Sequence, residues 1–378
     1  MAINIEDLRR RARRRLPRAV FDFVDGGADD ETTLRANRAA FRRLTFRPRV
    51  LVDVSSRDQS TTVLGERLST PLILGPTGLA GLTWPRGEIA AARAAAKRGA
   101  LFVLSTHSTC SIEEVAVAAH GPLWFQLYVG RDRQVTRSLV ERARAAGYRA
   151  LCLTVDVPVL GQRERDLRNG FTIPPRVTVG NVLDVLRHVG WLRGVLAGPR
   201  VTFRNFLDAE GVTSTSALAL GAYIQQLHDP SVNWDDLAWF RSLWPGPLAL
   251  KGIMNSEDAR QALEHGVDAI VVSNHGGRQL DGLPAAIEVL PEIATAVGGR
   301  AEVIYDGGIR RGADVVKAIA LGARACMIGR PFLYGLASGG QAGVERALEI
   351  LEKDIDRTLA LIGRPCLSDL DCSAVRTE

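Results

Sequence analysis

Cysteine is scarce in this sequence, and its spacing is not that of a metal site. The 378 residues include five cysteines, and no two of them are spaced as C-x-x-C. An odd number of scattered cysteines excludes a disulfide scaffold and suggests no bound metal. We expect reduced thiols, as in a cytoplasmic protein. Cys152 and Cys326 lie within apolar runs, so both are predicted to pack in the core.

Long apolar runs are also missing. No segment approaches the roughly 20 consecutive apolar residues of a membrane-spanning helix, and the first residues lack the apolar stretch of a signal peptide. Hydrophobic residues make up 46% of the chain and charged residues 24%, which is ordinary for a globular protein. We expect a single domain over residues 1–378.

Positive charge is concentrated at the start of the chain. The formal net charge is +6, and residues 1–20 hold seven arginines against two acidic residues. Ile5, Leu8, Ala12 and Leu16 recur at helical spacing, which predicts an amphipathic helix with an arginine-rich face. A solvated face is the simpler interpretation, and an anionic membrane or partner surface is the alternative. We expect no nucleic acid partner, because no aromatic platform accompanies the arginines.

Short apolar runs typical of β-strands alternate with helical stretches. This alternation indicates parallel βαβ units, and eight such strands favour a closed (β/α)8 TIM barrel in the α/β class. The predicted strands are residues 72–75, 101–104, 123–127, 150–155, 248–251, 269–273, 302–305 and 325–328, and the helical stretches include residues 87–98, 137–146, 256–265 and 312–321.

Two segments do not follow this alternation. Residues 1–70 precede the first strand and are expected to form a cap of helices and a short hairpin. Residues 157–246 form an insert after strand four, and insertions of this length are usually functional. Within the insert, residues 176–204 interleave five arginines with valines, leucines and a tryptophan, which is typical of a segment at a membrane surface. An active-site lid or an oligomer contact is the alternative.

Polar residues follow every predicted strand. The active site of a TIM barrel lies at the carboxyl ends of its strands, so these residues mark the expected site. They are Thr77 and Gly78, Ser105 and His107, Gln126 and Tyr128, Thr154 and Asp156, Lys251, Ser273 with His275 and Arg278, Asp306 with Gly307, Gly308 and Arg310, and Gly329 with Arg330.

The loops after strands seven and eight have the features of a phosphate site. Gly307 and Gly308 let the backbone turn tightly and approach a ligand, and Arg310 and Arg330 supply positive charge. A phosphate site at this place recurs in TIM barrels. We therefore expect a ligand that carries phosphate.

His275 is the strongest candidate for an active-site base. It follows a buried strand, and Arg278, three residues later, can bind a substrate carboxylate through two hydrogen bonds. Asp156, from another strand end, would orient the imidazole and favour its protonated form. Lys251 ends an apolar strand, where an ammonium group is costly unless an anion accompanies it.

These motifs resemble the FMN-dependent 2-hydroxy acid oxidase and dehydrogenase family. The resemblance rests on residues 273–281 (SNHGGRQLD) and 306–312 (DGGIRRG) and covers nearly the whole chain. Residues 75–79, 124–129 and 163–167 are similar to the (S)-mandelate dehydrogenase branch. The resemblance implies FMN as cofactor, oxidation of an (S)-2-hydroxy acid to the 2-keto acid, electrons passed to a quinone or oxygen, and a homotetramer.

The resemblance also implies roles for individual residues. His275 would remove a substrate proton, Asp156 would stabilise the imidazolium, and Tyr128 would hydrogen-bond the substrate. Arg163 and Arg278 would bind its carboxylate, and Lys251 would stabilise the reduced flavin. FMN would contact Thr77, Gly78, Ser105, Gln126, Thr154, Lys251, Ser273, Asp306, Gly307, Gly308, Arg310, Gly329 and Arg330.

Two positions depart from the family pattern. Phe23 stands where a carboxylate-binding tyrosine is expected, and the missing hydrogen bond to an anion is worth about 1–3 kcal/mol. His107 stands where glycolate oxidase has a tryptophan. Phe23 argues against glycolate or lactate, and His107 offers a polar contact to a larger substrate, so we expect an aromatic or bulky, mandelate-like acid. The alternatives are a larger natural-product or peptide intermediate with a hydroxy or amino group, and a barrel that binds flavin without catalysis. We expect a cytoplasmic enzyme or one held peripherally on the inner membrane.

Overall fold

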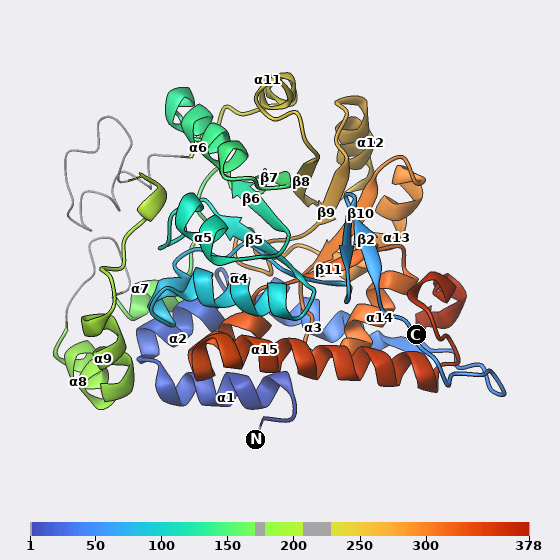
Figure 1. The fold of residues 1–378 in the computed structure, drawn as a ribbon, viewed down its shortest axis with the longest axis horizontal. Coiled ribbons are helices and arrows are strands. Elements are labelled where there is room, and N and C mark those ends of the chain that lie inside the picture. The colour runs from blue at the N-terminus through green and yellow to red at the C-terminus, as the bar shows by residue number, and fades with distance from the viewer. Residues whose placement is uncertain (1, 171–177, 207–227, 378) are drawn as a thin grey trace.

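The computed structural model describes residues 2–170, 178–206 and 228–377 (Figure 1). Eight parallel strands close into a barrel in the order β10-β11-β4-β5-β6-β7-β8-β9. All eight predicted strands are present, and the predicted TIM barrel is confirmed. The strands are β4 (Leu72–Leu74), β5 (Leu101–Ser105), β6 (Leu123–Leu127), β7 (Ala150–Thr154), β8 (Leu248–Ile253), β9 (Ala269–Val272), β10 (Glu302–Asp306) and β11 (Ala325–Ile328).

The inside of the barrel is filled by side chains rather than open. The large indole of Trp124 is fully buried there, beside small residues such as Ala150, Ala249 and Ala269 that leave room for it. Cys152 belongs to the same cluster, and Cys326 is buried on the side facing the helices. All five cysteines are free thiols.

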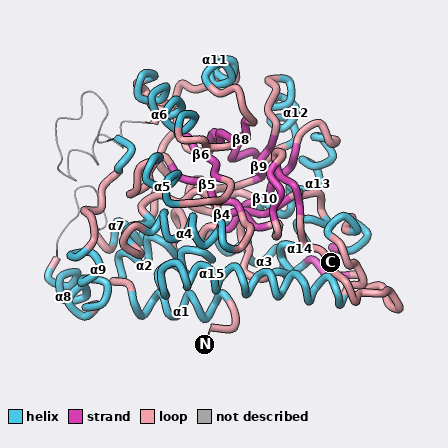
Figure 2. Tube along the Cα trace, viewed as in Figure 1, coloured by secondary structure: helices cyan, strands magenta, loops and turns pink. Residues whose placement is uncertain are grey.

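Helices surround the barrel, as Figure 2 shows with magenta strands at the centre. The predicted helix at residues 137–146 is wrong at its start, because it begins at Arg133. The Asp132 carboxylate accepts hydrogen bonds from the backbone N–H groups of Gln134 and Val135 and so caps the helix earlier. The surrounding helices are α4 (Gly87–Lys97), α5 (Ile112–Ala118), α6 (Arg133–Ala145), α11 (Asp236–Leu243), α12 (Ser256–Glu264), α13 (Ala286–Val297), α14 (Gly312–Ala320) and α15 (Arg330–Leu361).

Three helices and a hairpin precede the first barrel strand. They are α1 (Ile5–Arg15), α2 (Arg18–Asp25) and α3 (Thr32–Arg43), followed by β2 (Thr61–Val63) and β3 (Glu66–Leu68). Val63 and Leu68 of the hairpin pack with the barrel interior, where they close the amino ends of the strands. The division into one domain with a cap and an insert stays a prediction.

Segments near the two ends of the described chain pack against parts of the chain that are distant in sequence. Helix α1 lies along α15 (Figure 1), and it buries Ile5, Leu8 and Ala12 while its arginine-rich face stays exposed, as the apolar spacing predicted. The strand β1 (Leu44–Phe46) pairs with β12 (Val375–Thr377) in an antiparallel sheet that the sequence did not predict.

Besides α11, the described part of the insert contains α7 (Glu164–Arg168), α8 (Val179–Arg187), α9 (Val189–Ala197) and a 3-10 turn at Arg204–Phe206. Neither α8 nor α9 buries a side chain. The pair is nevertheless anchored, because Asp184 accepts from the Arg18 backbone N–H at 2.6 Å and Trp191 Nε1 donates to the Leu82 carbonyl at 2.7 Å. Arg176 of the predicted surface segment lies outside the described residues. Among the described helices, none has the length and apolar content needed to cross a membrane.

Candidate active site

A cavity of about 560 Å³ opens at the carboxyl ends of the barrel strands. It brings together predicted residues from seven separate strand ends, from the segment before the barrel and from the insert after β7. The predicted residues that line it are Phe23, Thr77, Gly78, Ser105, His107, Tyr128, Arg163, Lys251, His275, Arg278, Asp306, Gly307, Gly308, Arg310, Gly329 and Arg330.

Four predicted site residues lie behind the cavity wall. Asp156 contacts His275, Ser273 contacts Lys251, and Gln126 accepts a hydrogen bond from Ser105. Thr154 ends β7 beside Lys251 of the neighbouring strand. Each of the four therefore lies next to a residue that lines the cavity.

His275 is held by three neighbouring groups. Its Nδ1 lies 2.9 and 3.0 Å from the two carboxylate oxygens of Asp156, and its backbone N–H donates to Ser273 Oγ at 3.0 Å. The hydroxyl of Tyr128 lies 3.4 Å from Nε2. The φ angle of His275 is 57°, in the left-handed region that costs a β-carbon-bearing residue free energy. The surrounding contacts fix the ring so that Nε2 is the nitrogen on the Tyr128 side.

The charge states of this pair are set by burial and by each other. Burial lowers the pKa of His275, and the nearby Asp156 carboxylate only partly offsets this, so the pKa stays below the usual histidine value. Burial raises the pKa of Asp156, but His275 and Lys251 outweigh it and lower the pKa overall. At neutral pH the imidazole is therefore uncharged and able to take up a proton, next to a charged carboxylate.

Lys251 is buried with an anion close by, as its position in an apolar strand predicted. Its Nζ donates to Ser273 Oγ at 2.9 Å and lies 3.1 Å from Asp306 Oδ2. Burial alone would lower the pKa of Lys251, but Asp306 and Asp156 outweigh it and raise the pKa above the usual lysine value. The floor of the cavity thus carries a fixed positive charge.

Two arginines face the cavity, and neither has a carboxylate partner among the described residues. Arg278 Nη1 donates to the carbonyls of Phe23 and Gly26, both at 2.8 Å, and the Nε of Arg163 is buried without a hydrogen-bond acceptor among the described residues. Burial lowers the pKa of both guanidinium groups, and the positive charges of Arg163 and Arg330 lower the pKa of Arg278 further. Two partly buried cations of this kind favour an anionic ligand.

Several buried polar atoms in this region fit FMN. Gln126 Nε2, Thr154 Oγ1 and Arg310 Nε have no hydrogen-bond partner among the described residues, although buried polar groups are normally paired. Gly307 and Gly308 have φ angles of 135° and 71°, so their backbone takes a path that larger residues rarely adopt.

Arg330 completes this set. Its guanidinium donates to the carbonyls of Asp25, Gly26 and Gly276, and burial lowers its pKa to about 10, which still leaves it charged at neutral pH. Gln126, Thr154 and Lys251 would hold the flavin ring and ribityl chain, and Arg310 and Arg330 would hold the phosphate.

His228 also belongs to this site, although it was not predicted from the sequence. It is only 7% exposed, it lines the same cavity, and its ring centroid lies 5.0 Å from that of Tyr128 and 5.6 Å from that of His107. The backbone of His228 bridges that of Gly130. His228 follows no barrel strand, so the rule that located the other residues could not find it.

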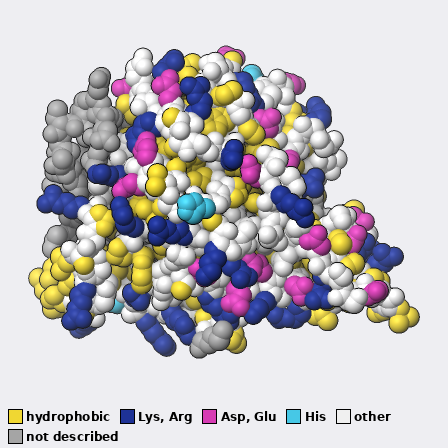
Figure 3. Space-filling model, in the orientation of Figure 1, with side chains coloured by type: hydrophobic (Ala, Val, Ile, Leu, Met, Phe, Trp, Pro, Cys, Tyr) yellow, Lys and Arg dark blue, Asp and Glu magenta, His cyan; other side chains and the backbone are white. Residues whose placement is uncertain are grey.

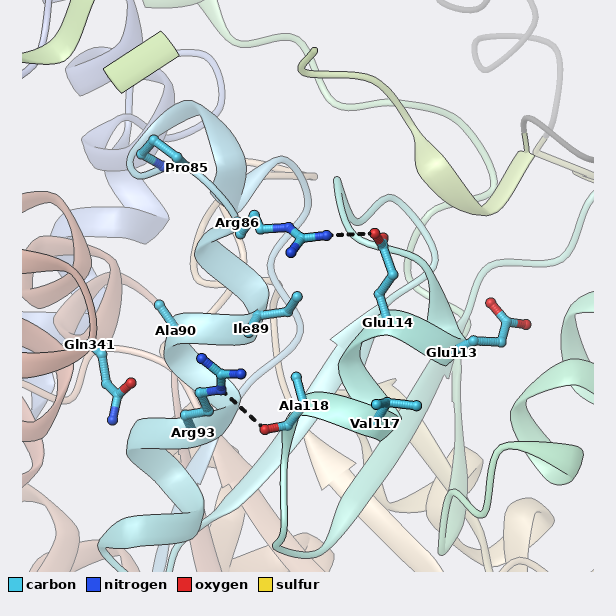
Figure 4. Close-up of a pocket in the computed structure, with 10 residues that line it drawn as sticks. All are labelled: Pro85, Arg86, Ile89, Ala90, Arg93, Glu113, Glu114, Val117, Ala118 and Gln341. Atoms are coloured by element: carbon cyan, nitrogen blue, oxygen red, sulfur yellow. Dashed lines mark hydrogen bonds and ion pairs between the residues drawn. The ribbon is translucent and has the colours of Figure 1, made fainter. Parts of the chain in front are cut away.

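A second hollow, of about 640 Å³, lies on the outer surface between α4 and α5 (Figure 4). An ion pair between Arg86 and Glu114 at 2.9 Å spans it, and Arg93 Nε donates to the Ala118 carbonyl. No predicted site residue lines it. The chemistry-bearing groups gather instead in the cavity at the strand ends.

The sequence profile of the FMN-dependent dehydrogenase family matches residues 12–377. This chain belongs to that family. It is 48% identical over 375 residues to the L-lactate oxidase of Nostoc sp., covering 98% of this chain and 97% of the relative. It is 45% identical over 376 residues to the (S)-mandelate dehydrogenase of Pseudomonas putida, covering 99% and 94%.

A solved structure described as the monotopic membrane protein (S)-mandelate dehydrogenase matches with a TM-score of 0.95, 44% identity and full coverage of both chains. The chain is therefore an FMN-dependent enzyme that oxidises 2-hydroxy acids, as the sequence motifs predicted. The relatives are named for different substrates, so family membership alone does not select one.

Proposed function

We propose that this enzyme oxidises an aromatic or bulky (S)-2-hydroxy acid, of the mandelate type, to the 2-keto acid. The observation that carries the proposal is the pair of partly buried arginines, Arg163 and Arg278, facing the same cavity as the His275–Asp156 pair. An anion clamp beside a neutral base suits a carboxylate whose neighbouring carbon loses a proton.

In this proposal each residue has one task. Arg163 and Arg278 bind the carboxylate and orient the substrate, while the Tyr128 hydroxyl holds the 2-hydroxyl group near His275. His275 Nε2 takes up the proton, and Asp156 stabilises the imidazolium through Nδ1, 2.9 Å away. FMN, when bound, supplies the acceptor for the two electrons. Lys251 keeps a positive charge at the barrel floor and balances negative charge that develops there.

The walls of the cavity support a bulky substituent at C2. Phe23 carries no hydroxyl that could bind a small, polar acid, and its ring is 5.3 Å from the Arg278 guanidinium carbon. Leu160, Leu167 and Phe203 add apolar surface to the same cavity. Burial of an aromatic substituent against these side chains would contribute binding free energy that lactate and glycolate lack.

We propose a quinone as the electron acceptor, with oxygen as the alternative. We also propose that α8 and α9 make a peripheral contact with the inner membrane. Leu183, Leu186 and Leu196 are 50%, 55% and 76% exposed. Figure 3 shows hydrophobic side chains gathered over these two helices, with Lys and Arg side chains beside them along α1. Apolar side chains next to arginines suit an anionic membrane surface. The monotopic description of the similar (S)-mandelate dehydrogenase supports this proposal.

Flavin reduction tests the proposed substrate. The purified holoenzyme is mixed without oxygen with mandelate, lactate, glycolate and a long-chain 2-hydroxy acid, and bleaching of the flavin is followed. We expect mandelate to reduce the flavin most efficiently. Equal or higher efficiency with lactate or glycolate would refute a bulky substrate.

Reoxidation of the reduced flavin by a soluble quinone or by oxygen then identifies the electron acceptor. Light scattering on a sizing column tests the expected homotetramer.

Co-sedimentation with vesicles tests the membrane contact. A variant with Leu183→Ser, Leu186→Ser and Leu196→Ser is expected to lose binding to vesicles containing anionic lipid but to keep activity with a soluble acceptor. Leu361→Ser is the matched control, because Leu361 is 72% exposed on α15, away from the two helices. Absence of binding by the unaltered protein would refute the contact.

The second candidate substrate is a larger natural-product or peptide intermediate with a hydroxy or amino group. His107 favours it, because it brings a polar ring into the cavity where an apolar wall would suit a simple aromatic acid. A holoenzyme that binds FMN but is reduced by none of the four hydroxy acids would favour this candidate.

A further inference from the structure

Two imidazole rings flank the ring of Tyr128 on the substrate side of the cavity. The ring centroid of His107 lies 5.0 Å from that of Tyr128, tilted by 30°, and that of His228 also lies 5.0 Å away, nearly edge-on at 74°. The two imidazoles are themselves 5.6 Å apart and perpendicular. Because Tyr128 in turn reaches His275, the pair lies one residue away from the proposed base.

In the described ranges no side chain or backbone group makes a hydrogen bond or ion pair with the ring of His107 or of His228. The Nε2 atom of His228 is fully buried without a partner in this part of the chain. Buried polar atoms without partners are uncommon in folded proteins and mark places where a ligand or ordered water completes the bonding.

The surroundings keep both rings uncharged. Burial lowers the pKa of His107 to about 3, helped by the neighbouring His228 and Arg163. Burial lowers the pKa of His228 to about 4, helped by His275. A neutral imidazole offers one donor and one acceptor. A hydroxyl or an amide can satisfy both, whereas a second carboxylate would find no positive charge on these two rings.

We propose that His107 and His228 bind the far end of the C2 substituent and select 2-hydroxy acids in which that substituent carries a neutral hydroxyl or amide group. This rests on the proposed function, since it assumes that Arg163 and Arg278 hold the carboxylate in the same cavity. The apolar side chains Leu160, Leu167 and Phe203 would then surround the middle of the substituent, with the polar group at the imidazole pair.

A packing role alone would not explain the pair. His107 already has aromatic neighbours, Phe203 at 5.5 Å and Phe206 at 6.1 Å, and a phenyl ring would pack among them without leaving nitrogen atoms unpaired. Discrimination by hydrogen bonding is strong in a closed site, because a substrate that lacks the matching group leaves buried polar atoms unpaired.

Matched substrates test the proposal. The values of kcat and KM are measured for mandelate and for its 3-hydroxy and 4-hydroxy derivatives with the holoenzyme and with His107→Phe and His228→Phe. We expect the unaltered enzyme to favour a ring-hydroxylated substrate. In each variant the ratio of kcat/KM values, hydroxylated over plain, should fall about 10-fold to 100-fold, mainly through KM. His228→Gln, which keeps a neutral donor and acceptor, should recover part of the preference.

Phe206→Leu is the control for packing, because Phe206 touches His107 but does not line the cavity. It should leave the substrate ratio unchanged, and FMN absorbance reports whether each variant is folded. Equal losses on all substrates in the histidine variants would overturn the proposal and assign the pair to positioning Tyr128.

Binding of 2-keto acids tests the role of His107 and His228 independently of the proposed function. The 2-keto acids derived from mandelate and from its hydroxy derivatives are titrated into the holoenzyme, and the flavin spectrum reports their dissociation constants. If no 2-hydroxy acid reduces the flavin, the proposed function fails. Tighter binding of the hydroxylated keto acids that is lost in His228→Phe would still support the pair, and equal binding would overturn it.

Discussion

Arg278 and Arg330 share one acceptor, the carbonyl oxygen of Gly26, which lies 2.8 Å from Arg278 Nη1 and 2.7 Å from Arg330 Nη2. Gly26 follows directly after α2, so the segment before the barrel positions both guanidinium groups. One arginine is the proposed ligand of the substrate carboxylate, and the other is the proposed ligand of the FMN phosphate. The two binding functions therefore meet at a single backbone atom.

Replacing either arginine by lysine should separate these two functions. Arg278→Lys keeps the charge but loses the planar fork, so we expect KM for the hydroxy acid to rise about 10-fold to 100-fold with FMN retained. Arg330→Lys is the matched variant, and it should weaken FMN binding with a smaller effect on KM. Steady-state kinetics and the FMN content of the purified proteins measure both effects. An unchanged KM in Arg278→Lys would contradict the assignment of the carboxylate site.

Removing the proposed base should abolish proton uptake without removing the cofactor. In His275→Gln the side chain can no longer accept a proton at neutral pH, so we expect the rate of flavin reduction to fall about 100-fold to 10,000-fold. Anaerobic stopped-flow absorbance measures that rate, and the flavin spectrum before mixing serves as the control. A rate within a few-fold of the unaltered enzyme would exclude His275 as the base.

The pH profile should report the Asp156–His275 pair. The base must be uncharged to act, and its pKa lies below the usual histidine value, so kcat/KM should stay level down to about pH 6.5 and fall only below it. Asp156 raises the pKa of His275, hence Asp156→Asn should move the acid limb to still lower pH while reducing the plateau. A limb that moves to higher pH in Asp156→Asn would contradict this coupling.

The buried charge of Lys251 should matter for stability as well as for catalysis. Lys251→Met leaves the Asp306 carboxylate without its ammonium partner, so we expect the free energy of unfolding to fall by about 3 kcal/mol, together with slower flavin reduction. Adding Asp306→Asn should restore part of the stability, because the unpaired charge is then gone. Urea unfolding measures these changes, and Lys353→Met at an exposed ion pair is the control, with an expected change below about 1 kcal/mol.

Phe23 should set part of the preference for substrate size. Phe23→Tyr adds a hydroxyl at the wall next to Arg278, so we expect kcat/KM for lactate and glycolate to rise about 10-fold, equivalent to one hydrogen bond to a charged group. The value for mandelate serves as the internal control and should change less. If all three substrates respond equally, the hydroxyl acts on catalysis rather than on recognition of small acids.

The barrel and most of its cavity could be predicted from the sequence because both depend on local patterns. Strands such as Ala269–Val272 are buried on both faces and therefore appear as short apolar runs. Once a closed barrel is assumed, the residues after each strand must meet at one end. His275, Asp156 and Lys251 were found in this way, although they are far apart in the chain.

The remaining features depend on contacts that leave no local pattern. His228 reaches the cavity because its segment folds back and bridges Gly130, and the spacing of residues in the insert does not encode that path. The acceptor at Gly26 is a backbone carbonyl, which every residue possesses. The early start of α6 depended on a single capping carboxylate at Asp132, a signal weaker than the apolar periodicity that defines the helix itself.

The antiparallel pairing of β1 with β12 has a consequence for synthesis in the cell. Thr45 and Arg376, which are hydrogen-bonded there, are separated by 331 residues. A ribosome adds roughly 5–20 residues per second, so β1 waits for tens of seconds before its partner strand emerges. During this time the barrel strands can already pair with their neighbours in the chain. The nascent segment at Leu44–Phe46 stays an open strand edge until then, and a chaperone that covers such edges would have its longest opportunity at this place.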